Sequence, residues 1–164
     1  MNKFTKSPFN SSLESGVRAV IILNFLFPKS VDLQRLVDFD YLVVHSADAD
    51  GPDSLHAPAP MRAGELLVRR NIIHDGLMLM MSRGLVTRVP TNNGIEFLAS
   101  ETTNSFVGCF SAPYLLKLKE RSIWVANQYG NTSNDELKNM MKSFFDKWTT
   151  QFQSIKKLSG DNNG

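Results

Sequence analysis

The stretch MMSRGLVTRVPTNNGIEFLA, residues 80–99, decides the fold of this 164-residue chain. Gly84 follows an apolar run that ends in an arginine, as a glycine often does at the C-terminal end of a helix. Two short β-prone runs then flank the turn Asn92–Asn93–Gly94, and an Asn-Gly pair in this position is the strongest short-range signal for a hairpin. Pro90 suits the end of an edge strand. The stretch therefore predicts a helix that ends at Gly84 and a two-stranded hairpin over residues 85–99.

Three helices are predicted on the N-terminal side of the hairpin. Ser11, with Glu14 three residues later, has the spacing of a capping box at the start of the first helix, and Pro28 ends that helix. The pattern then predicts a helix over 30–46, a loop rich in Gly, Pro and Asp over 47–60, and one long helix or two short ones over 62–84. Three helices followed by a hairpin is the order of a winged helix-turn-helix.

Helical patterns continue after the hairpin, over residues 101–130 and 134–158. In the second of these an apolar stripe lies opposite a lysine-rich face, and it consists of Leu137, Met141, Phe144, Phe145, Trp148, Phe152 and Ile155. We therefore expect a mainly α protein with a small β-hairpin, a winged helix-turn-helix with a C-terminal helical extension. The expected parts are a winged-helix-like domain over 1–104, helices over 105–158 that pack on it or on a partner, and a disordered tail over 159–164.

The composition limits the class of function. The net charge is only +2, so nucleic-acid binding would need a local basic patch. The single cysteine, Cys109, excludes an internal disulfide framework and fits a reducing compartment. The N-terminus lacks the apolar core of a signal peptide, and the most apolar run, VRAVIILNFLF, is too short for a bilayer and contains Arg18 and Asn24. These features predict a cytoplasmic protein with no membrane association.

A loop rich in histidine and aspartate is the first candidate site, and its members are His45, Asp48, Asp50, Asp53 and His56. Imidazole with carboxylate would suit zinc or iron, but the spacing matches no metal motif and does not fit a calcium loop. Aspartate, glycine and proline are also common in ordinary exposed loops. We favour a structural connector that a partner subunit recognises. Its histidines would form hydrogen bonds that hold the loop against the helices. No metal or other cofactor is expected.

Neither nucleophilic catalysis nor phosphate binding has a motif in this chain. Cys109 lies in the apolar context FVGCFS, which is typical of an inert, buried thiol. No serine occupies a nucleophile elbow, and no glycine-rich loop precedes a lysine that could hold phosphate. The sequence therefore predicts that this protein is not an enzyme.

The charges are segregated along the chain. Residues 30–56 contain six aspartates and one arginine, whereas residues 61–90 contain five arginines, one glutamate and one aspartate. One face could then meet a basic partner and another an acidic one, or the two blocks could form internal Arg–Asp pairs or solvated faces. The candidate contacts to a partner or to DNA are Arg62, Arg69, Arg70, Arg83 and Arg88, with Asn92 and Asn93 at the hairpin turn.

Several motifs, including DLQRLVDFDYLVVHS, SLHAPAP and GELLVRR, resemble the middle component of ABC-three component systems. The resemblance covers about residues 7–130, and before GELLVRR, where family chains usually show a Pro-x-x-Pro-x-Arg pattern, this chain has Pro58, Pro60 and Arg62. It implies a small winged-helix accessory subunit between an SMC/Rad50-like ABC ATPase and an effector, often a nuclease. Lamassu anti-phage and anti-plasmid defence systems are of this type. The resemblance supplies no catalytic residues.

Three functions remain open from the sequence. The first is an accessory subunit in an ATPase–effector complex, which could also reach DNA through that complex. The second is a stand-alone winged-helix transcription regulator, which should bind a palindromic site as a homodimer. The third is a metal-dependent hydrolase built on the histidine–aspartate loop, which purified protein with bound metal would reveal. We favour the first.

Overall fold

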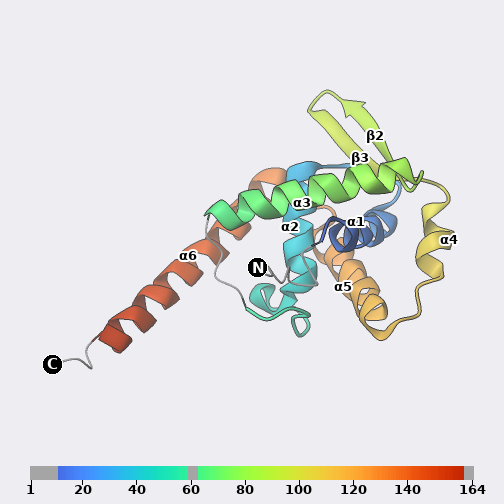
Figure 1. Ribbon diagram of the computed structural model, residues 1–164. Coiled ribbons are helices and arrows are strands. Elements are labelled where there is room, and N and C mark those ends of the chain that lie inside the picture. The colour runs from blue at the N-terminus through green and yellow to red at the C-terminus, as the bar shows by residue number, and fades with distance from the viewer. Residues whose placement is uncertain (1–10, 59–62, 161–164) are drawn as a thin grey trace, which may run out of the picture.

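The computed structural model describes residues 11–58 and 63–160 (Figure 1). The elements in chain order are α1 (Ser12–Leu26), β1 (Val31–Asp32), α2 (Leu33–Val44), a short 3-10 helix (Ser46–Ala49), α3 (Ala63–Ser82), β2 (Val86–Thr91), β3 (Gly94–Ala99), α4 (Thr103–Gly108), α5 (Pro113–Tyr129) and α6 (Asn134–Gly160). The protein is therefore mainly helical, with a small antiparallel sheet.

Local capping sets the ends of the first two helices. The Ser11 side chain accepts a hydrogen bond from the Glu14 amide at 3.2 Å, which confirms the predicted N-cap. Asp32 caps α2 in the same way and accepts from the Arg35 amide at 2.7 Å. The second helix was predicted to begin at residue 30, which is wrong by three residues, because Val31 and Asp32 are extended and pair with a strand.

The hairpin forms where the sequence predicts it. Strands β2 and β3 pair antiparallel from Val86 opposite Ala99 to Thr91 opposite Gly94, which leaves Asn92 and Asn93 as the two-residue turn. Gly94 has φ 117°, a conformation that favours glycine. Strand β1 pairs with the other edge of β3, so the strand order is β1-β3-β2.

Helix α1 is the centre of the core and packs most extensively against α3 (Figure 1). The two helices cross closely at a pair of glycines, because a Cβ atom on Gly76 would lie 2.6 Å from the backbone nitrogen of Gly16. The most deeply buried large side chains come from α1, α2, α3, α5 and α6, and they include Ile21, Phe39, Leu77, Leu118 and Leu137. The predicted parts 1–104 and 105–158 thus contribute to the same hydrophobic cluster.

The predicted helix over 101–130 is in fact two helices. Helix α4 ends at Gly108, and α5 begins at Pro113, which occupies the first helical turn. Proline is favoured there because the amide it lacks would have no partner within the helix. Helix α5 packs on α1 and α2.

Helix α6 begins against α2, and its C-terminal half projects away from the body (Figure 1). Leu137, Met141 and Phe144 of the predicted apolar stripe are buried. The side chains of the stripe residues Trp148, Phe152 and Ile155 lie outside the described ones. The helix reaches Gly160, so the first two residues of the expected tail are helical, whereas 161–164 lie outside the described residues.

Within the described ranges, none of the helices combines the length and the apolar character that crossing a membrane requires.

Candidate functional site

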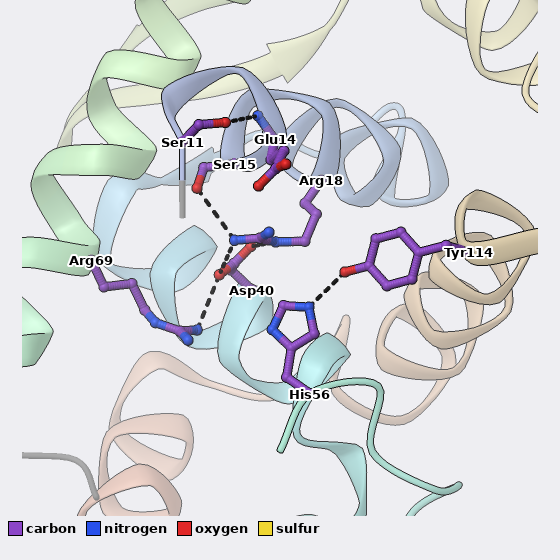
Figure 2. A network of polar contacts seen from close by, with 8 residues as sticks. All are labelled: Ser11, Glu14, Ser15, Arg18, Asp40, His56, Arg69 and Tyr114. Atoms are coloured by element: carbon purple, nitrogen blue, oxygen red, sulfur yellow. Dashed lines mark hydrogen bonds and ion pairs between the residues drawn. The ribbon is translucent and has the colours of Figure 1, made fainter. Parts of the chain in front are cut away.

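A cluster of buried charges joins the three N-terminal helices (Figure 2). Asp40 lies in the middle of α2, and its side chain is only 2% exposed. Arg18 of α1 donates from Nε to Asp40 Oδ1 at 2.8 Å and from Nη2 to Oδ2 at 3.4 Å, while Arg69 of α3 donates from Nη1 to Oδ2 at 3.1 Å. Arg18 also donates to the Ser15 hydroxyl at 3.3 Å. One carboxylate therefore binds two guanidinium groups from two other helices.

The charges in this cluster hold one another ionised. Burial alone would raise the pKa of Asp40, but the guanidinium groups of Arg18 and Arg69 outweigh burial and lower it. Burial opposes the charge of Arg18 as well, yet the neighbouring Asp40 carboxylate raises the Arg18 pKa above its ordinary value. The cluster is thus an ion-paired support of the fold at all ordinary pH values.

Two histidines lie beside this cluster and are held neutral. His45 at the end of α2 is 5% exposed, and its ring meets that of His56 edge-on with the centroids 6.2 Å apart. His56 Nε2 is 2.6 Å from the hydroxyl of Tyr114 on α5, and the two rings stack (Figure 2). Burial, with neighbouring arginines as a further cause, lowers the pKa of each histidine to about 4. These contacts attach the loop to α5.

The aspartates of the loop point to different partners. Asp48 accepts a hydrogen bond from the Tyr41 hydroxyl, and Asp50 ends the 3-10 helix in a left-handed conformation with φ 55°. The backbone oxygen of Asp53 accepts from Arg121 Nε at 3.1 Å and from its Nη2 at 2.9 Å. Among the residues that the structure describes, no three His, Cys, Asp or Glu side chains are grouped to hold a metal ion.

The structure separates Arg69 from the other predicted contact arginines that it describes. Arg69 is bound to Asp40 inside the protein, so the alternative of an internal Arg–Asp pair applies to it. Arg70 donates to the Gln34 side chain at 2.8 Å on the surface. Arg83 and Arg88 are exposed, as are Asn92 and Asn93 at the hairpin turn. Arg62, Pro60 and the end of the predicted loop lie outside the described residues.

Of the six aspartates in the acidic block, Asp50 and Asp53 are exposed, whereas the other four are buried or bound within the fold. Asp38 and Asp40 are 8% and 1% exposed, Asp32 caps α2, and Asp48 binds Tyr41. The expectation for the thiol was wrong, because Cys109 is exposed at the end of α4 and its Sγ donates to the Ser105 carbonyl at 3.3 Å. In the same stretch Val107 is buried in the core, whereas Phe106 is exposed like Cys109.

Sequence reasoning did not nominate several residues of the cluster, among them Ser15, Arg18, Asp40 and Tyr114. A signal existed for Arg18, because a charged residue in an otherwise apolar and buried helix needs a buried partner of opposite charge. The sequence could not say which of the six nearby aspartates this partner would be.

The fold and the buried cluster define a small, mainly helical protein whose central helices are tied together by paired charges. The family model for ABC-three component (ABC-3C) system Middle Component 2 matches residues 8–151, and the chain belongs to this family. No curated protein and no solved structure gives a significant match. The resemblance read from the sequence is thereby confirmed, and the match extends about 20 residues further toward the C-terminus than that resemblance did.

Proposed function

We propose that this chain is the non-catalytic accessory subunit that links an SMC/Rad50-like ABC ATPase to an effector nuclease in anti-phage and anti-plasmid defence of the Lamassu type. The observation that carries the proposal is the family match over residues 8–151, because a middle component is by definition one part of a multi-component ABC system. The site of action we propose is the cytoplasm, in keeping with the single cysteine of the chain.

The internal use of the charged side chains supports a role without catalysis. Asp40 binds Arg18 and Arg69, and His56 binds Tyr114, so these groups already have partners within the fold. A general base or a nucleophile needs a side chain that can reach a substrate. The polar residues of the cluster are better suited to holding α1, α2 and α3 in a fixed arrangement that a partner can recognise.

We further propose that residues 11–99 form a winged helix-turn-helix. Three helices precede the hairpin, and β1 between the first two helices pairs with β3. In the strand order β1-β3-β2, strand β2 lies at the edge of the sheet. The β2–β3 hairpin projects beyond α3, as the wing of such a fold does (Figure 1).

A second candidate is DNA binding by this same unit, as in a transcription regulator. The observation in its favour is a groove of about 420 Å³ between α3 and the hairpin, lined among others by Arg70, His74 and Arg88. Helix three and the wing are the parts with which winged-helix proteins contact DNA. Asp75 on α3 and Asp32 in the groove weaken the positive field there, so we rank this function second.

Co-expression with the ABC ATPase of the same system tests the proposed function. We expect the two proteins to co-elute in size-exclusion chromatography at low salt and to remain together at micromolar concentration. Separate elution under these conditions contradicts the proposed role.

A charge reversal separates the two candidates. The Arg83→Glu, Arg88→Glu variant is the informative one, because Arg69 is bound inside the protein and both chosen arginines are exposed. Loss of the ATPase complex in this variant indicates a protein-binding face. An intact complex with weaker DNA binding, and a salt dependence shallower by about 0.9 in log–log slope per lost phosphate contact, indicates a DNA-binding face.

A further inference from the structure

A groove of about 680 Å³ lies between α2 and the N-terminal half of α6. Its wall on the α6 side includes the apolar residues Leu137, Met141 and Phe145, and its wall on the α2 side includes Asp38. This volume is in the range of sites that bind small molecules or individual side chains of a partner. The groove therefore combines an apolar wall with the carboxylate of Asp38.

Among the described residues, Asp38 is buried without an ion-pair partner. The residue is 8% exposed, and Oδ1 accepts one hydrogen bond, from Gln34 Nε2 at 3.1 Å. Within the described ranges Asp38 makes no ion pair, in contrast to Asp40 on the same helix. A buried carboxylate normally binds a cation or several hydrogen-bond donors, because its desolvation is otherwise uncompensated.

The two arginines whose charges act on Asp38 are bound to other groups. Arg35 donates to the Asn134 side chain at 2.9 Å and to the Tyr129 carbonyl at 3.0 Å. Arg70 donates to the Gln34 side chain. Both still attract Asp38 electrostatically, but burial is the larger effect and raises the pKa of Asp38 to about 6. Among the residues that the structure describes, neither arginine forms an ion pair with this carboxylate.

We propose that this groove binds a protein segment that places a lysine or arginine side chain beside Asp38 and an apolar neighbour against Met141 and Phe145. The charge of Asp38 selects the cation, and the α6 wall selects the apolar neighbour. Asp32 and Asp135 line the groove as well, together with Arg35, Lys138 and Lys142. Acidic residues on either side of the inserted cation would therefore suit these three basic side chains. The proposal rests on the proposed function for its source of the segment, which is a partner subunit.

A pair of small probes tests the chemistry without the partner. Benzamidine carries an apolar ring and a cationic amidinium, and benzamide has nearly the same shape without the charge. Binding to the full chain is followed by the NMR signals of the Met141 methyl group and the Gln34 side-chain amide. We expect benzamidine to bind roughly tenfold more tightly than benzamide, since a charge-assisted contact of this kind contributes about one power of ten.

Two variants assign the preference to one carboxylate. Asp38→Asn should bind the two probes equally, whereas the control Asp135→Asn, which changes an exposed acid of the same groove, should keep the preference of the wild-type chain. Equal binding of both probes by the wild type, no binding of either, or an unchanged preference in Asp38→Asn overturns the proposal.

The ATPase complex then separates this inference from the proposed function. If the groove holds the partner, Asp38→Asn weakens the complex roughly tenfold and Asp135→Asn does not. If the wild-type chain binds no ATPase but shows the Asp38-dependent preference for benzamidine, the proposed function fails and the groove remains a site for a cationic side chain. If the complex forms and Asp38→Asn leaves it unchanged, the groove does not hold this partner and the inference is refuted.

Discussion

Replacing Asp40 by asparagine should destabilise the protein more than any other single charge removal in α2. The variant keeps the shape of the side chain and removes the charge that the guanidinium groups of Arg18 and Arg69 both bind. The Arg18 side chain is 5% exposed and cannot reach water, whereas that of Arg69 is 19% exposed and can partly regain its hydration. Breaking a buried ion pair from one side typically costs about 3–5 kcal/mol, and we expect a loss in this range, mostly from Arg18.

Urea denaturation followed by far-UV circular dichroism measures this loss. In thermal denaturation, each kcal/mol of lost stability lowers the melting temperature of a chain of this size by about 2–4 °C. We therefore expect the melting temperature to fall by roughly 10 °C. The control Asp75→Asn removes a carboxylate that is 68% exposed on α3, and it should change the free energy of unfolding by less than about 0.5 kcal/mol. A loss below about 1 kcal/mol in Asp40→Asn would show that the pairs are not a support of the fold, since such a value is typical of surface pairs.

A double variant tests the reason for the loss. Arg18→Met combined with Asp40→Leu removes the charges on both sides of the most buried pair, and Arg69 can then turn toward water. Replacing a buried ion pair by apolar side chains of similar volume is often neutral or stabilising. We therefore expect the double variant to recover most of the stability lost in Asp40→Asn. A double variant as unstable as the single one would indicate that packing, not charge, explains the effect.

Three further outcomes are expected. Gly76→Ala should lower the free energy of unfolding by about 1–3 kcal/mol, because its Cβ would meet the Gly16 backbone, whereas Gly108→Ala has open space and should be neutral or stabilising by thermal denaturation. His45 has a pKa of about 4 in the folded protein, below its value of 6.5 in the unfolded chain. Its contribution to the free energy of unfolding is therefore complete above pH 6.5, and about 3 kcal/mol is lost as the pH falls toward 4. The His45→Asn variant should show a flatter decline of stability in acid. The pKa of Asp38 is raised from 3.8 to about 6, so ionisation of this carboxyl group destabilises the fold as the pH rises from 4 to 6. Asp38→Asn should therefore be more stable than the wild type by up to about 3 kcal/mol at pH 7, and by much less at pH 4.

The elements that follow from short-range chemistry could be predicted from the sequence. The hairpin depends on the turn Asn92–Asn93–Gly94, and the first helix depends on Ser11, both of which act on residues nearby. Strand β1 could not be predicted, because two extended residues at Val31–Asp32 become a strand only through pairing with β3, about 65 residues away. The break before Pro113 was visible in the sequence as a helix-start signal.

The sequence could predict that arginines and aspartates pair inside the protein, but not which residues form each pair. The alternative of internal Arg–Asp pairing applied to Arg69, which lies 29 residues from Asp40 in the sequence. No local pattern distinguishes Asp40 from Asp38, because both lie in the same turn of α2 among apolar residues. Only the packing of α1 and α3 beside one of them, and of α6 beside the other, separates a paired carboxylate from an unpaired one.

This difference between two neighbouring aspartates bears on function. Asp40 binds two arginines and stabilises the fold, so a structural role explains it fully. Asp38 is also buried, though less deeply, has one neutral hydrogen-bond donor, and is expected to destabilise the fold at neutral pH. Natural proteins typically break such local rules at functional or strained sites. A role in binding is therefore the better explanation for Asp38, and the apolar wall of α6 beside it indicates a partner that brings both a cation and an apolar surface.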